Sequence, residues 1–322
     1  MLDRLLKKDI EDYKAKDLMT KAVITTVPKD NLLTIQNMMS RYRVKKIVIV
    51  DDKNRRCPVG IVTIKDIIKF LISDQTDREL YEIPVAEAMT ENLMTSNKNT
   101  NVIDCARTFH DHSNTISSLI VIEGDYVDQL DLPDNKHSQL SGILTSTDFA
   151  SFFSENCRSL ASVKDYMSDS VFSISINEKV SRAADLMIEK HISQLVVTAS
   201  NSHRDGFMGI LTETDISRVI LALKSKTLRS VYEYLQIIFY SSKRNNQDNF
   251  LEPALMRIRD IFTPNPTVID KDADLTEAAK IMVRQSISGI PVIESPREEE
   301  TKNQPIGIIS KIDIIKALRD LE

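Results

Sequence analysis

Apolar residues recur along the chain in two alternating patterns, one with helical spacing and one typical of buried strands. Four stretches of helical spacing can be superimposed, and each leads into a short run of mostly β-branched apolar residues. The helical stripes consist of Leu32, Ile35, Met39 and Val44 in the first copy; Val102, Cys105, Ala106, Phe109 and Ile116 in the second; Val180, Ala183, Ala184, Met187 and Ile192 in the third; and Leu275, Ala278, Ala279, Met282 and Ile287 in the fourth. The second copy matches only if two residues are inserted between His110 and Asn114. We therefore expect four amphipathic helices, each followed by a buried strand.

An octamer follows the buried strand in every copy. The octamers are GIVTIKDI from Gly60, GILTSTDF from Gly142, GILTETDI from Gly209 and GIISKIDI from Gly307. A lead segment, in which an acidic residue precedes a Met or Phe and then a Thr or Ser, lies upstream at residues 17–20, 87–90, 165–168 and 260–263. Each copy is predicted to be a β-α-β-β-α unit, ending in a helix that the octamer opens. A unit of about 50 residues is too small to bury its own sheet well, so the units are expected to pair.

Composition narrows the class of protein. The chain has 322 residues, of which 42% are hydrophobic and 28% charged, and none of its apolar stretches approaches the length of a membrane span. The N-terminus mixes charges into every turn and lacks the apolar core of a secretory signal, so we expect a cytoplasmic protein. Cys57, Cys105 and Cys157 stand far apart, which predicts buried thiols rather than disulfides or a metal site. A net charge of −5 gives no global attraction to nucleic acid.

Chemical motifs argue against catalysis. With only 7 glycines, the chain carries neither common glycine-rich phosphate loop, and it shows no nucleophile elbow and no metal-spaced His/Cys set. His110-Asp111-His112 suggests a metal site, but its spacing supplies no third ligand. We therefore predict that the protein is not an enzyme and holds no metal.

Taken together, the lead segment, the helical stripe and the recurring G-x-[IVL]-x-[ST]-x-x-D resemble the cystathionine-β-synthase-type (CBS) domain family over nearly the whole chain. The resemblance implies an α+β fold of four β-α-β-β-α CBS domains, at about 13–75, 83–157, 161–225 and 256–322. These would pair into two Bateman modules, at 1–158 and 159–322. The γ subunit of AMP-activated protein kinase has the same four-repeat arrangement, in which the two modules close into a disc.

The octamer supplies the first candidate site residues. Its Thr or Ser and its Asp three residues later form the pairs Thr63 and Asp66, Thr145 and Asp148, Thr212 and Asp215, and Ser310 and Asp313. The resemblance implies that the Asp accepts hydrogen bonds from the ribose of an adenosine ligand, while the hydroxyl meets phosphate at the helix N-terminus. The alternative is a capping box, although that motif prefers the longer Glu or Gln at the third position.

A second candidate position lies at the start of the buried strand, where the resemblance implies contacts to phosphate. The matching pairs are Lys45-Lys46, Ser117-Ser118, Ser193-Gln194 and Ser288-Gly289, of which Lys45, Lys46, Ser117, Ser193 and Ser288 are expected to contact ligand. Only the first pair is cationic. We therefore expect any preference for ATP over AMP to lie in the first module, unless the lysines are ordinary solvated residues.

Two segments exceed what a repeat requires. Residues 123–141 form a polar insertion, expected to be a loop that covers a cleft or docks a partner. Helical periodicity continues from 216 to about 242, accompanied by the cations Lys224, Lys226, Arg229, Lys243 and Arg244. The basic flank is either a solvated face or a docking surface for an acidic protein or RNA.

These features predict a stand-alone, non-catalytic regulatory protein. Its regulatory ligand would be AMP, ADP, ATP or S-adenosylmethionine, bound between paired CBS domains and sensed by a separate protein target. Two alternatives remain open at this stage. The chain could be an interaction scaffold with degenerate clefts, or an RNA-binding protein that uses the basic helix; a homodimer is equally open.

Overall fold

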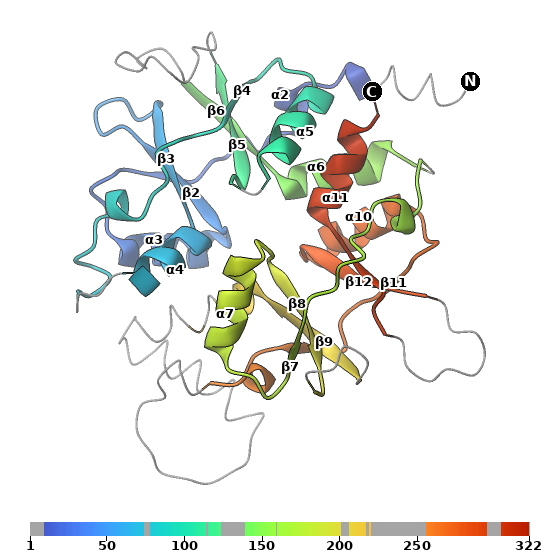
Figure 1. The fold of residues 1–322 in the computed structure, drawn as a ribbon. Coiled ribbons are helices and arrows are strands. Elements are labelled where there is room, and N and C mark those ends of the chain that lie inside the picture. The colour runs from blue at the N-terminus through green and yellow to red at the C-terminus, as the bar shows by residue number, and fades with distance from the viewer. Residues whose placement is uncertain are drawn as a thin grey trace.

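A computed structural model describes residues 10–73, 78–113, 115–123, 139–158, 160–200, 206–216, 219, 256–294 and 304–321. Its four small sheets are arranged around the middle of the molecule (Figure 1). In each sheet a short parallel strand and an antiparallel strand flank the central one, as β1 and β3 flank β2. The predicted α+β fold of four repeats is confirmed.

The described elements follow the same order in every repeat. Repeat 1 contains α2 (Ala15–Leu18), β1 (Thr25–Thr26), α3 (Leu32–Tyr42), β2 (Lys46–Val50), β3 (Pro58–Thr63) and α4 (Ile64–Ser73). Repeat 2 contains η1 (Val85–Glu87), β4 (Thr95–Asn97), α5 (Val102–Asp111), β5 (Ser118–Glu123), β6 (Gln139–Thr145) and α6 (Ser146–Asn156). Repeat 3 contains η3 (Val163–Asp165), β7 (Ser173–Ser175), α7 (Val180–Glu189), β8 (Gln194–Thr198) and β9 (Phe207–Thr212). Repeat 4 contains η5 (Ile258–Asp260), β10 (Thr263–Pro264), β11 (Ile269–Asp270), α10 (Leu275–Arg284), β12 (Gly289–Ile293), β13 (Gly307–Ser310) and α11 (Lys311–Arg319).

The predicted helical stripes coincide with the buried faces of α3, α5, α7 and α10, except for the last residue of each stripe. These last residues lie beyond the helix ends and are partly buried: Val44, Ile116, Ile192 and Ile287. In α10, for example, Leu275, Ala278, Ala279 and Met282 are all fully buried. The side chain of the residue before the helix also caps its first turn, since Asp274 accepts a hydrogen bond from the backbone N–H of Thr276. Helical periodicity therefore located the core-facing side of each of these helices.

Each lead segment extends to the neighbouring repeat and forms backbone hydrogen bonds with a strand of its sheet, so the repeats are joined in pairs. Thr20 exchanges two backbone hydrogen bonds with Ile143 of β6, and Thr90 does the same with Ile61 of β3. In the second half of the chain, Ser168 pairs with Ile308 of β13, and β10 extends the sheet at β9. The sheets of repeats 1 and 2 also share a buried apolar cluster. Repeat 1 is thus paired with repeat 2 and repeat 3 with repeat 4, as predicted, whereas the limits at 158 and 159 remain predictions.

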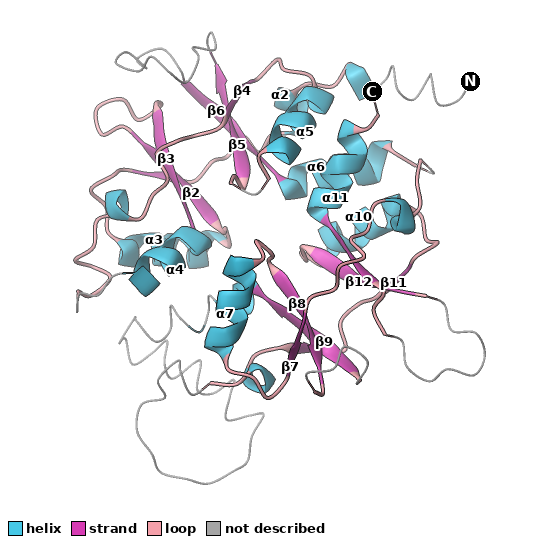
Figure 2. Ribbon diagram, viewed as in Figure 1, coloured by secondary structure: helices cyan, strands magenta, loops and turns pink. Residues whose placement is uncertain are grey.

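Helices join the two pairs through repeats 2 and 4. Helix α6 packs against α10 and α11, and α5 packs against α11, so these helices gather between two of the sheets (Figure 2). Their side chains form one buried cluster, which includes Phe109 and Phe149 with ring centroids 5.5 Å apart. In the described part of the chain, repeats 1 and 3 instead have separate apolar clusters. The four repeats thus form a ring around the middle of the molecule, and a shared core connects the two modules where repeats 2 and 4 meet.

Several predictions fall at the edges of the described chain. The predicted insertion lies largely outside the described residues, because 124–138 are not described, and the predicted long helix lies outside them beyond Val219. Within the described ranges, no helix is both long and apolar enough to cross a bilayer. Cys57, Cys105 and Cys157 are buried thiols, as predicted.

Candidate functional site: a lysine cluster where the repeats meet

Every octamer forms a capping box. The Asp carboxylate accepts a hydrogen bond from the backbone N–H of the Thr or Ser three residues earlier, at 2.8 Å in Asp66, 2.7 Å in Asp148, 2.9 Å in Asp215 and 2.7 Å in Asp313. The preference of this motif for Glu or Gln therefore does not argue against a cap here. The extended backbone of the capping residue, with φ −121° and ψ 166° at Thr145, brings its N–H within reach of the shorter side chain. The use of Asp does not by itself indicate a ligand.

The paired repeat contributes a side chain at Asp148. The hydroxyl of Thr20, from the lead segment of repeat 1, donates to Asp148 Oδ1 at 3.0 Å. The second carboxylate oxygen accepts from Thr145, whose hydroxyl lies 2.6 Å from it. Asp148 is thus oriented from both repeats of its module. Thr20 was not predicted as a site residue, because its proximity depends on the crossing of the lead segment.

Three lysines converge where the repeats meet. The ammonium of Lys45 donates to the Thr214 hydroxyl at 3.1 Å, which links repeat 1 to repeat 3. Lys46 donates to the carbonyl oxygen of Ser117 at 2.5 Å, which links repeat 1 to repeat 2.

The third lysine, Lys311, comes from repeat 4. It donates to the Thr147 hydroxyl of repeat 2 at 2.9 Å and is only 7% exposed. We call Lys45, Lys46 and Lys311 the lysine cluster. The cluster draws its cations from both modules.

Burial and neighbouring cations lower the pKa of Lys46 and Lys311. Desolvation is the main reason that the pKa of Lys46 is lowered to about 8; Lys45 and Lys311 act in the same direction, while Asp148 and Asp66 oppose the shift. Desolvation likewise lowers the pKa of Lys311 to about 8, again with Lys45 adding to the effect and Asp148 opposing it. Bringing cations together where they are poorly solvated is unfavourable unless anions compensate them, and Asp148 and Asp66 do so only in part. The cluster is therefore a candidate anion site.

Repeats 3 and 4 lack this charge at the matching place. In their module the position of Lys46 is taken by Gln194, which is buried, and its amide lies against Gly289 of repeat 4. Ser193 and Ser288 are exposed, and their carbonyl oxygens accept from the backbone N–H groups of Glu213 and Lys311. The predicted difference between the cationic first pair and the neutral others therefore coincides with a structural difference between the modules.

Sequence reasoning missed Lys311. It occupies the first helical position of α11, where the positive end of the helix disfavours a cation. The octamers of the other repeats have Ile64, Ser146 and Glu213 at this position, so an unfavourably placed lysine was a detectable signal. Its proximity to Lys45 could not be predicted, because the two residues belong to different modules.

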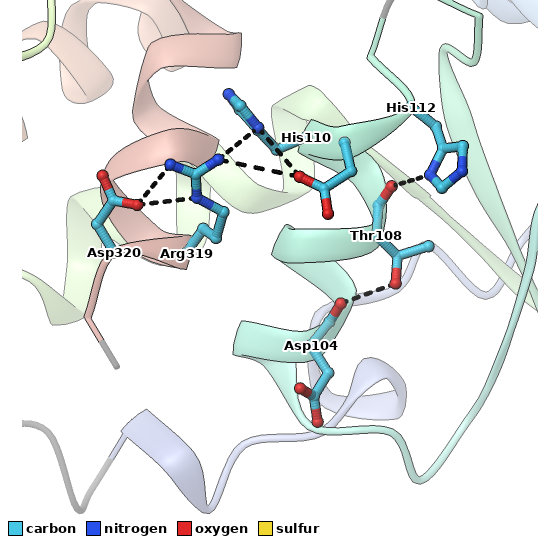
Figure 3. A network of polar contacts seen from close by, with 7 residues as sticks. Asp104, Thr108, His110, His112, Arg319 and Asp320 are labelled. Carbon is cyan, nitrogen blue, oxygen red and sulfur yellow. Dashed lines mark hydrogen bonds and ion pairs between the residues drawn. The ribbon is translucent and has the colours of Figure 1, made fainter.

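The segment His110-Asp111-His112, which was weighed as a metal motif, forms contacts between repeats. Arg319 Nη1 of α11 lies 2.9 Å from His110 Nδ1 and 3.9 Å from an oxygen of Asp111, while His112 contacts the carbonyl oxygen of Thr108 (Figure 3). Among the described residues, no group of three or more His, Cys, Asp or Glu side chains could hold a metal ion. His110 and Asp111 thus connect repeat 2 to repeat 4.

A cavity of about 240 Å³ opens between repeats 3 and 4. Its lining includes Asp169 and Ser173 after the lead segment of repeat 3, Phe207 of β9, and Ile306 just before β13. None of the predicted site residues lines it. Both repeats of the second module therefore contribute to a space that could admit part of a small ligand.

Comparison with known proteins assigns the family. The CBS domain model matches residues 15–73, 163–222 and 258–320, which together exceed half of the chain. The chain belongs to the CBS domain family. Repeat 2 falls outside the matched ranges, although its sheet and its cap follow the same pattern as the others.

Several archaeal proteins resemble this CBS protein along almost its whole length. Uncharacterized protein MJ1404 of Methanocaldococcus jannaschii is 21% identical over 95% of this chain, which spans 62% of that protein's length. Protein MJ1225 of the same organism is 21% identical over 94% of this chain and 97% of its own. The crystal structure of MJ1225 superimposes with a TM-score of 0.71 at 20% identity, over 94% of this chain and 99% of that one. An uncharacterized conserved protein from Pyrococcus horikoshii gives a TM-score of 0.57 at 18% identity, over 95% of this chain and all of the other.

The depressed pKa of Lys311 predicts a pH dependence of stability. Between about pH 8 and 10.5, the unfolded chain binds a proton at Lys311 that the folded chain does not, so the free energy of unfolding rises with pH in this window. Relative to Lys311→Met, wild type should gain roughly 1 to 3 kcal/mol across it. Buried Cys105 and Cys157, whose pKa values are raised to about 11 and 12, have the opposite effect above pH 9, but they cancel in the comparison.

Urea unfolding at pH 7.5, 9 and 10.5 measures this difference. Lys65→Met is the matched control. Lys65 also lies in an octamer, but it is exposed, and its ammonium group lies 3.9 Å from the carboxylate of Glu213. The control should show a smaller dependence on pH. A difference between wild type and Lys311→Met that stays constant with pH would contradict the prediction.

Proposed function

We propose that this CBS protein is a non-catalytic regulatory protein that binds a phosphorylated adenosine ligand between paired repeats. The observation that carries the proposal is the lysine cluster, which gathers beside the oriented carboxylate of Asp148. The family resemblance supplies the adenosine part, since the octamer Asp is the residue that would accept the ribose hydroxyls. The lysines supply the preference for phosphate.

Charge distinguishes between the candidate adenosine ligands. S-adenosylmethionine carries a sulfonium cation, which Lys45, Lys46 and Lys311 would repel, whereas adenine nucleotides carry phosphate anions that would compensate them. Near repeat 2 the electrostatics thus favour AMP, ADP or ATP. The neutral Gln194 in the second module imposes no such preference, so the two modules are expected to differ in ligand selectivity.

Ligand binding would act through the packing of the two modules. The lysine cluster includes residues from both, so an anion bound there would stabilise one relative arrangement of them. A separate protein target that contacts both modules would sense the change. This target is a proposal, as is the absence of catalysis.

Replacing Asp148 by Asn tests the proposal. Ligand at about 100 times its dissociation constant should raise the free energy of unfolding of wild type by about 2.7 kcal/mol for each occupied site. Asp148→Asn should remove the contribution of its site, because an amide oxygen accepts ribose hydroxyls more weakly than a carboxylate, while the lost cap costs about 1 kcal/mol or less. Thermal unfolding with and without AMP or ATP measures both effects.

Asp165→Asn is the matched control. Asp165 accepts from the backbone N–H of Ser162 at 2.8 Å in the same type of cap, but it lies in a lead segment rather than an octamer. The control should lose the cap energy and keep the ligand effect. If the octamer variants Asp66→Asn, Asp148→Asn, Asp215→Asn and Asp313→Asn all retain full stabilisation by ligand, the proposal fails.

The interaction scaffold remains the second candidate, and the observation that favours it is the complete capping box in every octamer. An absence of stabilisation by any adenosine compound would support it. RNA binding by the basic helix stays a prediction, because Lys224, Lys226, Arg229, Lys243 and Arg244 lie outside the described residues.

A further inference from the structure

We infer that the repeat 2 site takes a ligand with a di- or triphosphate group, clamped from one module by Lys46 and from the other by Lys311. This inference rests on the proposed function and specifies the ligand class and the residues that select it. The ligand class is defined by a chain of two or three linked phosphates, which both a nucleoside di- or triphosphate and an inorganic polyphosphate carry. Lys311 is then a specificity-determining residue contributed by repeat 4 to a site of repeat 2.

The two ammonium groups contact repeat 2 at different residues close to its octamer. Lys46 contacts Ser117, which directly precedes β5, whereas Lys311 contacts Thr147, which lies in the first turn of α6. Thr145 pairs in register with Ser118, next to the residue that Lys46 contacts, and Thr147 follows Thr145 by two residues, so both contacts lie close to the capping pair. A chain of phosphates could therefore meet both cations, while one phosphate at the helix end would meet fewer of them.

A buried hydroxyl provides an independent indication of a ligand. Ser118 is only 6% exposed, and its Oγ has no hydrogen-bond partner among the residues that the structure describes. Paired residues of neighbouring strands direct their side chains to the same face, so Ser118 shares a face with Thr145. An unsatisfied buried hydroxyl costs free energy, which a bound phosphate oxygen would recover.

Two carboxylates near the cluster offset part of its positive charge. Asp148 and Asp66 interact electrostatically with Lys46, but both carboxylates already accept hydrogen bonds in the caps of their own helices. Asp148 also accepts from Thr20. Three lysines thus share two carboxylates that also cap helices, and a multivalent anion would add attraction between the modules.

The second module provides a natural comparison. Gln194 occupies the position of Lys46 and Gly289 that of Ser118, so the same place in repeats 3 and 4 has a neutral amide. Substituting Lys46→Gln reproduces this arrangement in the first module. Lys311→Met removes the other cation with a side chain of similar length and relieves the repulsion from Lys45, so the variant is expected to fold.

Isothermal titration calorimetry with adenosine, AMP, ATP and inorganic tripolyphosphate tests the inference on the full chain. ATP should bind wild type more tightly than AMP. Lys311→Met and Lys46→Gln should each weaken ATP binding by roughly tenfold or more, and adenosine binding by less than about twofold. Lys65→Met is the control for loss of one positive charge at a contact between modules, and it should leave the ratio of ATP to AMP affinity unchanged.

The outcomes separate this inference from the proposed function. If adenosine and AMP bind but neither variant changes the ratio of ATP to AMP affinity, the clamp is refuted and the proposed function stands. If tripolyphosphate binds and the variants weaken it, while adenosine compounds add nothing, the clamp stands and the proposed function fails. Loss of ATP binding in Lys65→Met equal to that in Lys311→Met would also refute the clamp, since it would show a general effect of charge.

Discussion

Replacing Gly209 by alanine should destabilise the protein by about 3 kcal/mol or more. Gly209 begins the octamer of repeat 3 and lies where β10 crosses β9. A Cβ atom added there would overlap the carbonyl oxygen of Thr263 and lie 2.8 Å from the Phe262 ring. Because the clash involves backbone, relief requires β10 to move away from β9, and the pairing of repeats 3 and 4 would weaken.

Gly60→Ala is the matched control for that substitution. Its Cβ would meet the flexible side chain of Met89 at 2.8 Å, and the backbone oxygen of Thr90 only at 3.3 Å. We expect a smaller loss, of about 1 kcal/mol, because Met89 can change rotamer. Chemical unfolding of both variants measures the loss of unfolding free energy. Equal losses would show that the close approach of the lead segment backbone is not the reason for glycine at position 209.

Truncating Phe149 to alanine should cost about 3 to 5 kcal/mol. Its ring is fully buried in α6 and packs edge-on against Phe109, within the core that repeats 2 and 4 share. The cavity should therefore loosen both modules. Hydrogen exchange should reveal lost protection in α11, which lies in the other module.

Ile35→Ala provides the comparison from repeat 1. Ile35 is equally buried, but it belongs to the separate cluster of that repeat. The variant should lose roughly 2 to 5 kcal/mol while α11 keeps more of its protection. If both variants unprotect α11 equally, the shared core does not couple the modules in the way that the packing indicates.

Local patterns predicted the elements of the fold well. The stripe from Leu275 to Met282 identified the buried face of α10 because helical periodicity is a property of consecutive residues. Recurrence of the octamer predicted the repeats for the same reason. The reason that the octamers begin with glycine was not predictable, since it depends on the lead segment of another repeat crossing there.

Contacts between repeats limited the prediction of the site. The sequence indicated Lys45 and Lys46, but not Lys311, which meets them only because the two modules close into a ring. His110 and Asp111 were considered as metal ligands, since their sequence gave no sign of Arg319. In each case, the residue that decides the chemistry lies far along the chain from its partners.

The core shared by repeats 2 and 4 also constrains how the protein is made. Helices α5 and α6 are complete once Asn156 has been synthesised, but α10 begins only at Leu275 and α11 at Lys311. At ordinary rates of translation, that interval lasts on the order of ten seconds. During this interval the apolar faces of α5 and α6, which carry Phe109 and Phe149, lack the helices that later cover them. The nascent chain therefore presents an apolar surface that chaperones could bind until repeat 4 has been made.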